Sequence, residues 1–271
     1  LAMRLREIFL EPAVRGVPVD DDSLIEIHAE ISRSKPLLRS AFKSFYTQMI
    51  EAADHLGAPT RCEVELGSGG GFLKDIRPSV ITTDVRPMGT LDRALNAEAM
   101  DIRSESVSRF YAINVFHHLP NPRFFFKELI RVLEPKGVCI LIEPHTGLVS
   151  SWLHSRIHED EYFDITMQNW ERPQKGGPMS GANQALADIV FERDRHVFQE
   201  EFGSGLRIAS KDYCMNGLRY LFSGGVNFRQ LVPTFCNPLL CAMESAFAPV
   251  ARHWSLHQII ALQKNEPSNF N

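Results

Sequence analysis

Several features that mark other classes of protein are missing from this sequence. The five cysteines among its 271 residues are odd in number and form no C-x-x-C pair, which argues against both a disulfide framework and a zinc site. No apolar run is long enough to cross a bilayer, and Leu1–Arg4 lacks the apolar core of a signal peptide. The chain contains no internal repeat and no low-complexity tract. We therefore expect a reduced, cytoplasmic protein without a transmembrane segment.

An excess of positive charge is missing as well. The formal net charge is −4 and the pI is near 6.2, so the chain has no overall basic footprint for nucleic acid. Net charge does not exclude a local basic patch. The composition, with 44% hydrophobic and 23% charged residues, is that of an ordinary globular protein. We expect a single structural domain and no nucleic-acid partner, and the oligomeric state stays open.

Apolar residues recur with two different spacings along the chain. Helical spacing marks a segment after Asp20–Ser23 and a second one from Pro36 to about Leu56. Strands and helices then alternate, which is typical of an α/β protein with a doubly wound, mostly parallel sheet. The expected strands are 64–66, 79–84, a weak third at 95–100, 109–115, 138–143, 206–214 and 257–264, and the expected crossover helix is 122–133. Such sheets bind ligands at the carboxyl ends of their strands.

Glycine is concentrated at one place, directly after the first expected strand. The segment from Cys62 to Phe72 reads CEVELGSGGGF. Because glycine has no side chain and tolerates unusual backbone angles, a ligand can lie directly against the main chain of such a turn. A dinucleotide fingerprint, G-x-G-x-x-G, would need a glycine where the sequence has Phe72. The turn alone therefore leaves open which class of ligand it holds.

The order of the motifs that follow the turn is more specific. Asp84 ends the second expected strand, Met100-Asp101 comes next, residues 114–120 read NVFHHLP, and residues 129–137 read LIRVLEPKG. In this order the motifs resemble the class I S-adenosylmethionine-dependent methyltransferases, particularly the small-molecule, methyltransferase type 11-like branch. The resemblance covers about residues 60–145. It implies a seven-stranded Rossmann-like methyltransferase fold with helical additions, S-adenosylmethionine as the cofactor and S-adenosylhomocysteine as its product.

The resemblance also implies which residues would hold the methionine end of the cofactor. The loop residues that would let this end approach the backbone are Gly67, Ser68, Gly69 and Gly71. Glu65 would orient the loop or reach the methionine ammonium through water; the alternative is that Glu65 simply caps the loop. Asn114, at the end of the fourth expected strand, would lie near the transferable methyl group.

The nucleoside end would be held by two acids. Asp84 would accept hydrogen bonds from both ribose hydroxyls, since a carboxylate only accepts. Asp101 would accept from the adenine amine, with Met100 and Ile102 packing on the ring. The alternatives are that Asp84 is a turn acid and that Asp101 caps a short helix. The segment 84–95 is short, so the helix that usually lies there must be abbreviated.

Three histidines are candidates for a general base. Methyl transfer from a sulfonium is an in-line displacement, in which the protein mainly aligns the reactants and excludes water. A base is needed only if the acceptor arrives protonated, and histidine is suited to that task near neutral pH. The candidates, all near expected strand ends, are His117, His118 and His145; the alternative for each is a ring that packs and bonds to the backbone. His154 and His158 lie four apart without an H-E-x-x-H motif, so we expect a solvated helix face and no metal site.

The resemblance implies different roles for different segments of the chain. A helical segment at 1–58 and a helical acceptor region at 148–256 would cover a cofactor-binding core at 59–147, and 257–271 would form the last strand and tail. The expected function is methyl transfer to an oxygen atom of a small or medium-sized metabolite. The chain lacks the Asn- or Asp-Pro-Pro-aromatic segment of enzymes that methylate amino groups of nucleic-acid bases, which disfavours such acceptors. The alternatives are a non-catalytic scaffold protein that binds S-adenosylmethionine and, less favoured, an NAD-dependent oxidoreductase.

Overall fold

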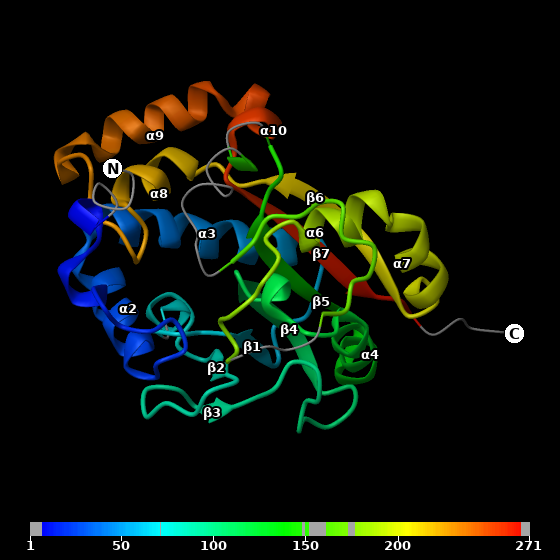
Figure 1. Ribbon diagram of the computed structural model, residues 1–271. Helices are drawn as coiled ribbons and strands as arrows, with labels where there is room; N and C mark the ends of the chain where they lie inside the picture. The colour runs from blue at the N-terminus through cyan, green and yellow to red at the C-terminus, as the bar shows by residue number, and fades with distance from the viewer. Residues whose placement is uncertain (1–6, 71, 148–149, 152–160, 173–176, 267–271) are drawn as a thin grey trace, which may run out of the picture.

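A central sheet organises the molecule. The computed structural model describes residues 7–70, 72–147, 150–151, 161–172 and 177–266. Seven strands are hydrogen-bonded in the order β3-β2-β1-β4-β5-β7-β6 (Figure 1). Their bounds are β1 Glu63–Leu66, β2 Ile81–Asp84, β3 Arg93–Ala94, β4 Val107–Ile113, β5 Leu133–Pro144, β6 Leu206–Tyr213 and β7 His257–Lys264. Neighbours run parallel from β3 to β5, and β7 is antiparallel to both β5 and β6.

The middle strands are buried on both faces. Successive side chains of a strand point to opposite sides of the sheet, so one strand contributes to two cores. Phe110 and Leu141 belong to a core that includes Phe126 from the helix after β4. Tyr111 and Ile140 belong to the other core, against the N-terminal helices. The continuous apolar runs of β4 and β5 are the sequence signature of this double burial.

Helices cover both faces of the sheet (Figure 1). α3 packs against β5 and β7, whereas α4 packs against β5 and α7 against β6. The α-helices are α2 Ser23–Ser34, α3 Pro36–His55, α4 Pro122–Val132, α6 Leu186–Asp188, α7 Arg195–Phe202, α8 Gly217–Ser223, α9 Asn237–Ala246 and α10 Ala251–Trp254. The shorter turns are the 3-10 helices η1 Pro12–Val14, η2 Leu73–Asp75, η3 Phe116–His118, η5 Thr234–Cys236 and η6 Ala248–Val250, and the π-helix η4 Ile189–Arg193.

Local sequence signals explain where the main helices begin. Pro36 and Pro122 occupy the first turn of α3 and α4, where the missing N–H of proline costs nothing. The Asn121 side chain accepts a hydrogen bond from the N–H of Arg123 at 3.1 Å and so caps α4. Among the acids before α2, Asp21 accepts from the N–H of Ser23 at 2.9 Å. These caps stabilise helices that also bury an apolar face.

The α/β class, the mostly parallel sheet and the strand positions are confirmed, except for the third strand. β3 lies at Arg93–Ala94 and not at 95–100, so that prediction is wrong. Leu95, Ala97 and Met100 are apolar because their side chains are buried in the core, but the segment that carries them is irregular and does not pair with the sheet. The abbreviated connection after β2 is confirmed, because residues 85–92, all of them described, form no helix.

Two further points concern the predicted helices. In the expected helical acceptor region 148–256, residues 186–193 fold as α6 followed by η4, and most of residues 148–160 lie outside the described part of the chain. His154 and His158 are among those undescribed residues. None of the helices that the structure describes combines the length and apolarity that a membrane span needs.

Candidate active site

The carboxyl ends of the parallel strands meet at one edge of the sheet. Leu66 at the end of β1 is in register with Ala112 of β4, and Ile113 of β4 is in register with Ile142 of β5. The residues that immediately follow these strands therefore lie close together. This is the edge at which doubly wound sheets bind their ligands.

The glycine turn after β1 depends on its glycines. Gly67 and Gly69 have positive φ angles of 61° and 51°, which favour glycine. A Cβ on Gly67 would lie 2.3 Å from Cγ2 of Val115, so there is also no room for a side chain. Ser68 fixes the turn to β2, since its N–H donates to the carbonyl of Thr83 at 2.8 Å and its Oγ accepts from the N–H of Thr83 at 3.1 Å. Gly71 lies outside the described residues.

Helix α2 covers the outside of this turn. A Cβ on Gly70 would come within 2.9 Å of the backbone Cα of Ala29, so the turn and the helix are in direct contact. The guanidinium of Arg33 donates to the carbonyl of Gly70 at 2.9 Å. Helix α2 therefore packs directly on the turn through Ala29 and Arg33.

Glu65 presents a buried acceptor beside the turn. Its side chain is 3% exposed, and no described residue hydrogen-bonds to its Oε2 atom. Burial raises the pKa of Glu65 to about 7, and hydrogen bonds from Ser68 and Tyr46 offset this rise only in part. A buried carboxylate oxygen without a donor is costly, and a ligand that brings a positively charged N–H group would satisfy it.

Asp84 ends β2 next to the turn. Its Oδ2 accepts from the N–H of Gly69 at 3.3 Å, and its Oδ1 accepts from the N–H of Arg86 at 3.2 Å. The side chain is half-buried. Two long backbone contacts leave acceptor capacity on both oxygens, because a carboxylate offers about four lone-pair sites.

Asp101 lies in a different setting from the other predicted acid. The chain after β3 runs alongside α4, from the start of this helix to its end. Glu98 accepts from the N–H of Asn121 at the start of α4. Arg131, in the last turn of α4, donates to the carbonyls of Met100 and Ile102 at 2.7 Å each. The Asp101 carboxylate is fully exposed and lies 3.7 Å from Arg93. Met100 is buried in the core, and Ile102 packs against it.

Asn96 lies two residues past β3, the strand that pairs with β2 at Asp84. The N–H of Leu95 donates to the carbonyl of Asp84 at 2.8 Å, so Asn96 follows directly past the carboxyl end of β3. Its Oδ1 accepts from the N–H of Glu98 at 2.9 Å, and the side chain is exposed. Sequence reasoning did not consider Asn96 as a candidate, because it placed the third strand later in the chain.

Asn114 is strained at the end of β4. Its φ angle is 55°, which is uncommon outside glycine, and its N–H donates to the carbonyl of Ile142 at 2.8 Å. The Oδ1 atom is buried, and the described residues provide it with no hydrogen-bond donor. A strained residue with an unsatisfied polar atom at this edge is typical of a ligand-binding position.

His117 is held by a buried carboxylate that sequence reasoning did not single out. Glu143, at the end of β5, is 0% exposed and accepts from the N–H groups of Val115 and Phe116 at 2.9 and 2.8 Å. It also lies 2.5 Å from Nδ1 of His117. Burial lowers the pKa of His117, but the charge and hydrogen bond of Glu143 outweigh it and raise the pKa above its usual value. Because Glu143 engages Nδ1, Nε2 is the nitrogen that is directed away from it.

His118 and Glu161 complete this cluster. Nε2 of His118 lies 3.5 Å from Oε1 of Glu161, and Nε2 of His117 lies 3.8 Å from Oε2. Burial, followed by the neighbouring charge of His117, lowers the pKa of His118 to about 3. Gln184 donates from Nε2 to Glu161. Glu161 is distant in sequence from the His-His pair, so no local signal identifies it.

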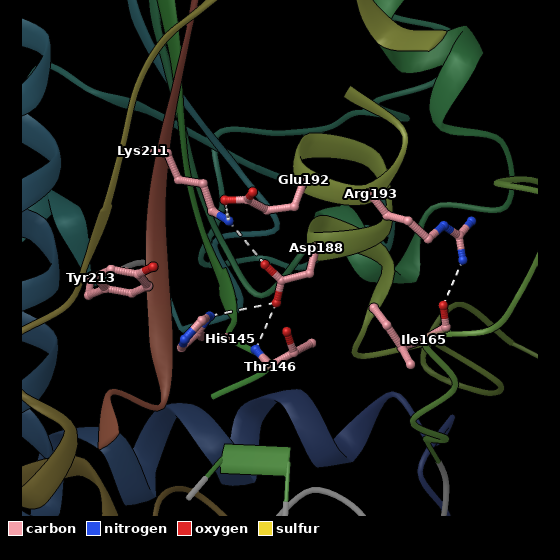
Figure 2. A pocket seen from close by; sticks show the side chains of 8 residues that line it. All are labelled: His145, Thr146, Ile165, Asp188, Glu192, Arg193, Lys211 and Tyr213. Atoms are coloured by element: carbon pink, nitrogen blue, oxygen red, sulfur yellow. Dashed lines mark hydrogen bonds and ion pairs between the residues drawn. The ribbon is translucent and has the colours of Figure 1, made fainter. Parts of the chain in front are cut away.

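His145 lies apart from this cluster, in a groove of about 540 Å³ (Figure 2). Its Nε2 bonds to the carbonyl of Arg252 at 3.0 Å, and its Nδ1 is 3.6 Å from Asp188. Burial raises the pKa of Asp188, but the nearby His145 ring, the charge of Lys211 and the hydrogen bond from the N–H of Thr146 outweigh it and hold the pKa well below its usual value. Figure 2 shows the Lys211 ammonium between the carboxylates of Asp188 and Glu192, at 3.1 and 2.5 Å.

Comparisons with known proteins agree with this geometry. Residues 65–141 match the family profile of the methyltransferase domain. A comparison with curated protein sequences gave no match. The strand order and the motifs around the glycine turn define an α/β protein with the Rossmann-like methyltransferase fold. The chain carries a class I S-adenosylmethionine-dependent methyltransferase domain, and S-adenosylmethionine is the cofactor of this family.

Solved structures with a similar fold include three methyltransferases. Geranyl diphosphate C-methyltransferase from Streptomyces coelicolor A3(2) is 15% identical, with 95% of this chain and 89% of that chain covered and a TM-score of 0.48. Phosphoethanolamine N-methyltransferase 2 from Haemonchus contortus is 10% identical, with coverages of 82% and 53% and a TM-score of 0.41. A SAM-dependent methyltransferase from Aquifex aeolicus is 12% identical, with coverages of 79% and 87% and a TM-score of 0.38. These likenesses are too distant to assign an acceptor.

Proposed function

We propose that this protein is an enzyme that transfers the methyl group of S-adenosylmethionine to an oxygen atom of a small or medium-sized acceptor. The observation that carries the proposal is the buried, unsatisfied Oε2 of Glu65 beside the glycine turn. The α-ammonium of the cofactor is a donor of the kind that this oxygen lacks. When bound, the cofactor supplies a methyl group already activated by its sulfonium.

Most of the residues proposed for the methionine end follow Glu65 closely in the sequence. Gly67, Ser68 and Gly69, with Gly71 following them in sequence, would present main chain to the ligand, since the positive φ angles of Gly67 and Gly69 favour glycine and a Cβ on Gly67 would clash with Val115. The unsatisfied Oδ1 of Asn114 would accept a further hydrogen bond from the ligand. Buried acceptors that are satisfied only by the ligand favour the correct ligand strongly.

Asp84 is proposed to bind the ribose hydroxyls through its remaining acceptor capacity. For the adenine ring, the sequence-based proposal names Met100, Asp101 and Ile102. Asn96 is a second candidate for the adenine amine, supported by its position directly past β3 beside Asp84. Asn96→Ala and Asp101→Ala therefore separate the two assignments: the variant that loses cofactor affinity identifies the adenine contact.

The acceptor is proposed to bind at the cluster of His117, His118 and Glu161. As the new carbon–oxygen bond forms, a hydroxyl acceptor must lose its proton, and this cluster provides basic atoms at the carboxyl end of β4. His145 is the weaker candidate, since its Nε2 is engaged by a backbone carbonyl. Helix α2 and the buried position of the cluster would exclude water from the reaction.

The test is a screen of hydroxyl-bearing metabolites with S-adenosylmethionine, read by product mass. We expect one acceptor class to gain a methyl group, and His118→Ala to reduce its turnover while cofactor affinity is retained. Cofactor binding without methylation of any acceptor would favour the scaffold alternative. Equal turnover in the Ala variants of His117, His118 and His145 would show that alignment alone performs the reaction.

A further inference from the structure

Three side chains that can ligate metals converge next to the carboxyl end of β4. The Nε2 atoms of His117 and His118 lie 3.8 and 3.5 Å from the two oxygens of Glu161. One donor atom from each of the three residues lies within 4.8 Å of the other two. We propose that His117, His118 and Glu161 bind one divalent transition-metal cation.

The distances between the potential ligand atoms are close to those expected around a bound cation. Tetrahedral bonds of about 2.0–2.1 Å place ligand atoms about 3.3 Å apart. Both histidine–carboxylate distances exceed this by only a few tenths of an ångström, and donor atoms of all three residues lie within 4.8 Å of one another. The two rings and the carboxylate are therefore spaced to share a central ion.

The surroundings orient the ligands. Glu143 lies 2.5 Å from Nδ1 of His117, which directs Nε2 of the same ring toward the cluster. Glu143 is itself fixed, because it is fully buried and accepts from the N–H groups of Val115 and Phe116. A carboxylate behind a ligating histidine is a recurrent feature of metal sites, where it sets the tautomer and the ring orientation. Glu143 is thus a positioning residue, and Gln184 has the same role for Glu161.

The donor set selects the class of cation. Two imidazoles and one carboxylate suit Zn²⁺, Co²⁺ or Fe²⁺, whereas Mg²⁺ and Ca²⁺ prefer oxygen ligands. Three protein ligands leave coordination positions for a substrate atom. The inference deepens the proposed function: a cation at this place would lower the pKa of an acceptor hydroxyl, so that the acceptor would release its proton to bulk water as it binds, and the cation rather than a histidine would account for the loss of that proton. Only that consequence rests on the proposed function; binding of the cation does not.

The test is a Co²⁺ titration of the chelator-treated, desalted full chain, without S-adenosylmethionine. We expect one equivalent of Co²⁺ to bind with the visible ligand-field absorption of a low-coordinate, nitrogen-containing site. Glu161→Gln and His118→Ala should each weaken Co²⁺ binding at least tenfold and remove the absorption band. Glu143→Gln should weaken binding by about 10–100-fold and shift the band, because ligand orientation changes. A merely structural role for Glu143 would not move the spectrum.

His145→Ala is the matched control, since His145 is also a buried histidine beside a carboxylate, and it should bind Co²⁺ like the unaltered chain. The proposal is overturned if no stoichiometric binding occurs. It is equally overturned if the band persists in both Glu161→Gln and His118→Ala, which would mean that other residues hold the ion. Binding of S-adenosylmethionine by each variant, measured separately, reports whether it is folded, so failure of the metal site and failure of the proposed function are distinguished.

Discussion

At the scale of single residues, the charge of Glu65 links folding to pH. The pKa of this buried acid is about 7 in the folded chain, against an ordinary value of 4.5. Between these two values the unfolded chain has already lost the proton that the folded chain retains, so the free energy of unfolding falls as pH rises. Above about pH 7 the loss is complete.

We therefore predict that Glu65→Gln stabilises the ligand-free protein at high pH. The expected gain at pH 8 is about 3 kcal/mol relative to pH 5, because an amide carries no charge to bury. Urea unfolding of both chains at the two pH values measures it. The difference between the chains isolates Glu65 from other titrating groups, and a difference that does not change with pH would contradict the assignment.

The same carboxylate predicts how cofactor binding depends on pH. A cationic ammonium favours the ionised form of Glu65, so binding below pH 7 should release a proton. Affinity for S-adenosylmethionine should rise by up to about tenfold per pH unit until pH 7 and then level off. Calorimetry in two buffers of different ionisation enthalpy counts the released proton. Glu65→Gln should bind more weakly and show no such rise; proton release by that variant would exclude Glu65 as its source.

The residues proposed for the cofactor were predictable where they stand at the end of a strand. Glu65, Asp84 and Asn114 stand at strand ends, and their positions follow from the strand pattern alone. Glu143 also lies near the end of an apolar strand, but it orients His117 through hydrogen bonds to residues that follow β4. The sequence of β5 alone does not predict these contacts. Glu161 comes to the histidines through tertiary folding only.

At the scale of elements, the turn after β1 tolerates only glycine at position 67. Gly67→Ala would place a Cβ 2.3 Å from Val115 at a positive φ angle, so we expect a loss of about 1–3 kcal/mol in the free energy of unfolding. Cofactor binding should weaken as well, since the turn must shift. Gly89→Ala is the control, because the described residues leave open space around its Cβ. Chemical unfolding and cofactor titration of both variants measure the effects, and equal behaviour would contradict the role of the turn.

Elements were predictable to different degrees for physical reasons. β4, β5 and α4 have long apolar patterns that tertiary contacts cannot override. β3 has two residues, too few for any periodicity, so its position was predicted wrongly. Asn96, which lies two residues past the observed β3, was therefore not considered beside Asp101 for the adenine amine.

At the scale of the whole molecule, the N-terminal helices belong to the same folded unit as the sheet. Arg109 of β4 is 2% exposed and binds the Asp54 carboxylate in α3 at 2.7 Å and the carbonyl of Pro59 at 2.8 Å. It also lies 3.6 Å from the buried Glu63. One guanidinium thus joins α3 to two strands.

We predict that Arg109→Leu destabilises the entire protein by about 3–5 kcal/mol, since a buried acid and backbone carbonyls lose their partner. Arg39→Leu is the control: its ion pair with Asp75 is about half exposed, and its loss should cost no more than about 1 kcal/mol. Urea unfolding monitored by a sheet signal and a helix signal measures both. Separate transitions for the two signals would show that the N-terminal helices are an independent unit.

The central claim is that the edge bounded by the glycine turn and Asp84 holds S-adenosylmethionine. Its most direct test is calorimetric titration of the unaltered chain and of Asp84→Ala with S-adenosylmethionine, S-adenosylhomocysteine and NAD. We predict that the first two ligands bind, that NAD shows no comparable binding, and that Asp84→Ala loses about 1–3 kcal/mol of affinity through the missing hydrogen bonds to a charged acceptor. Folded protein that binds neither S-adenosyl ligand, or an Asp84→Ala variant with unchanged affinity, would contradict the account.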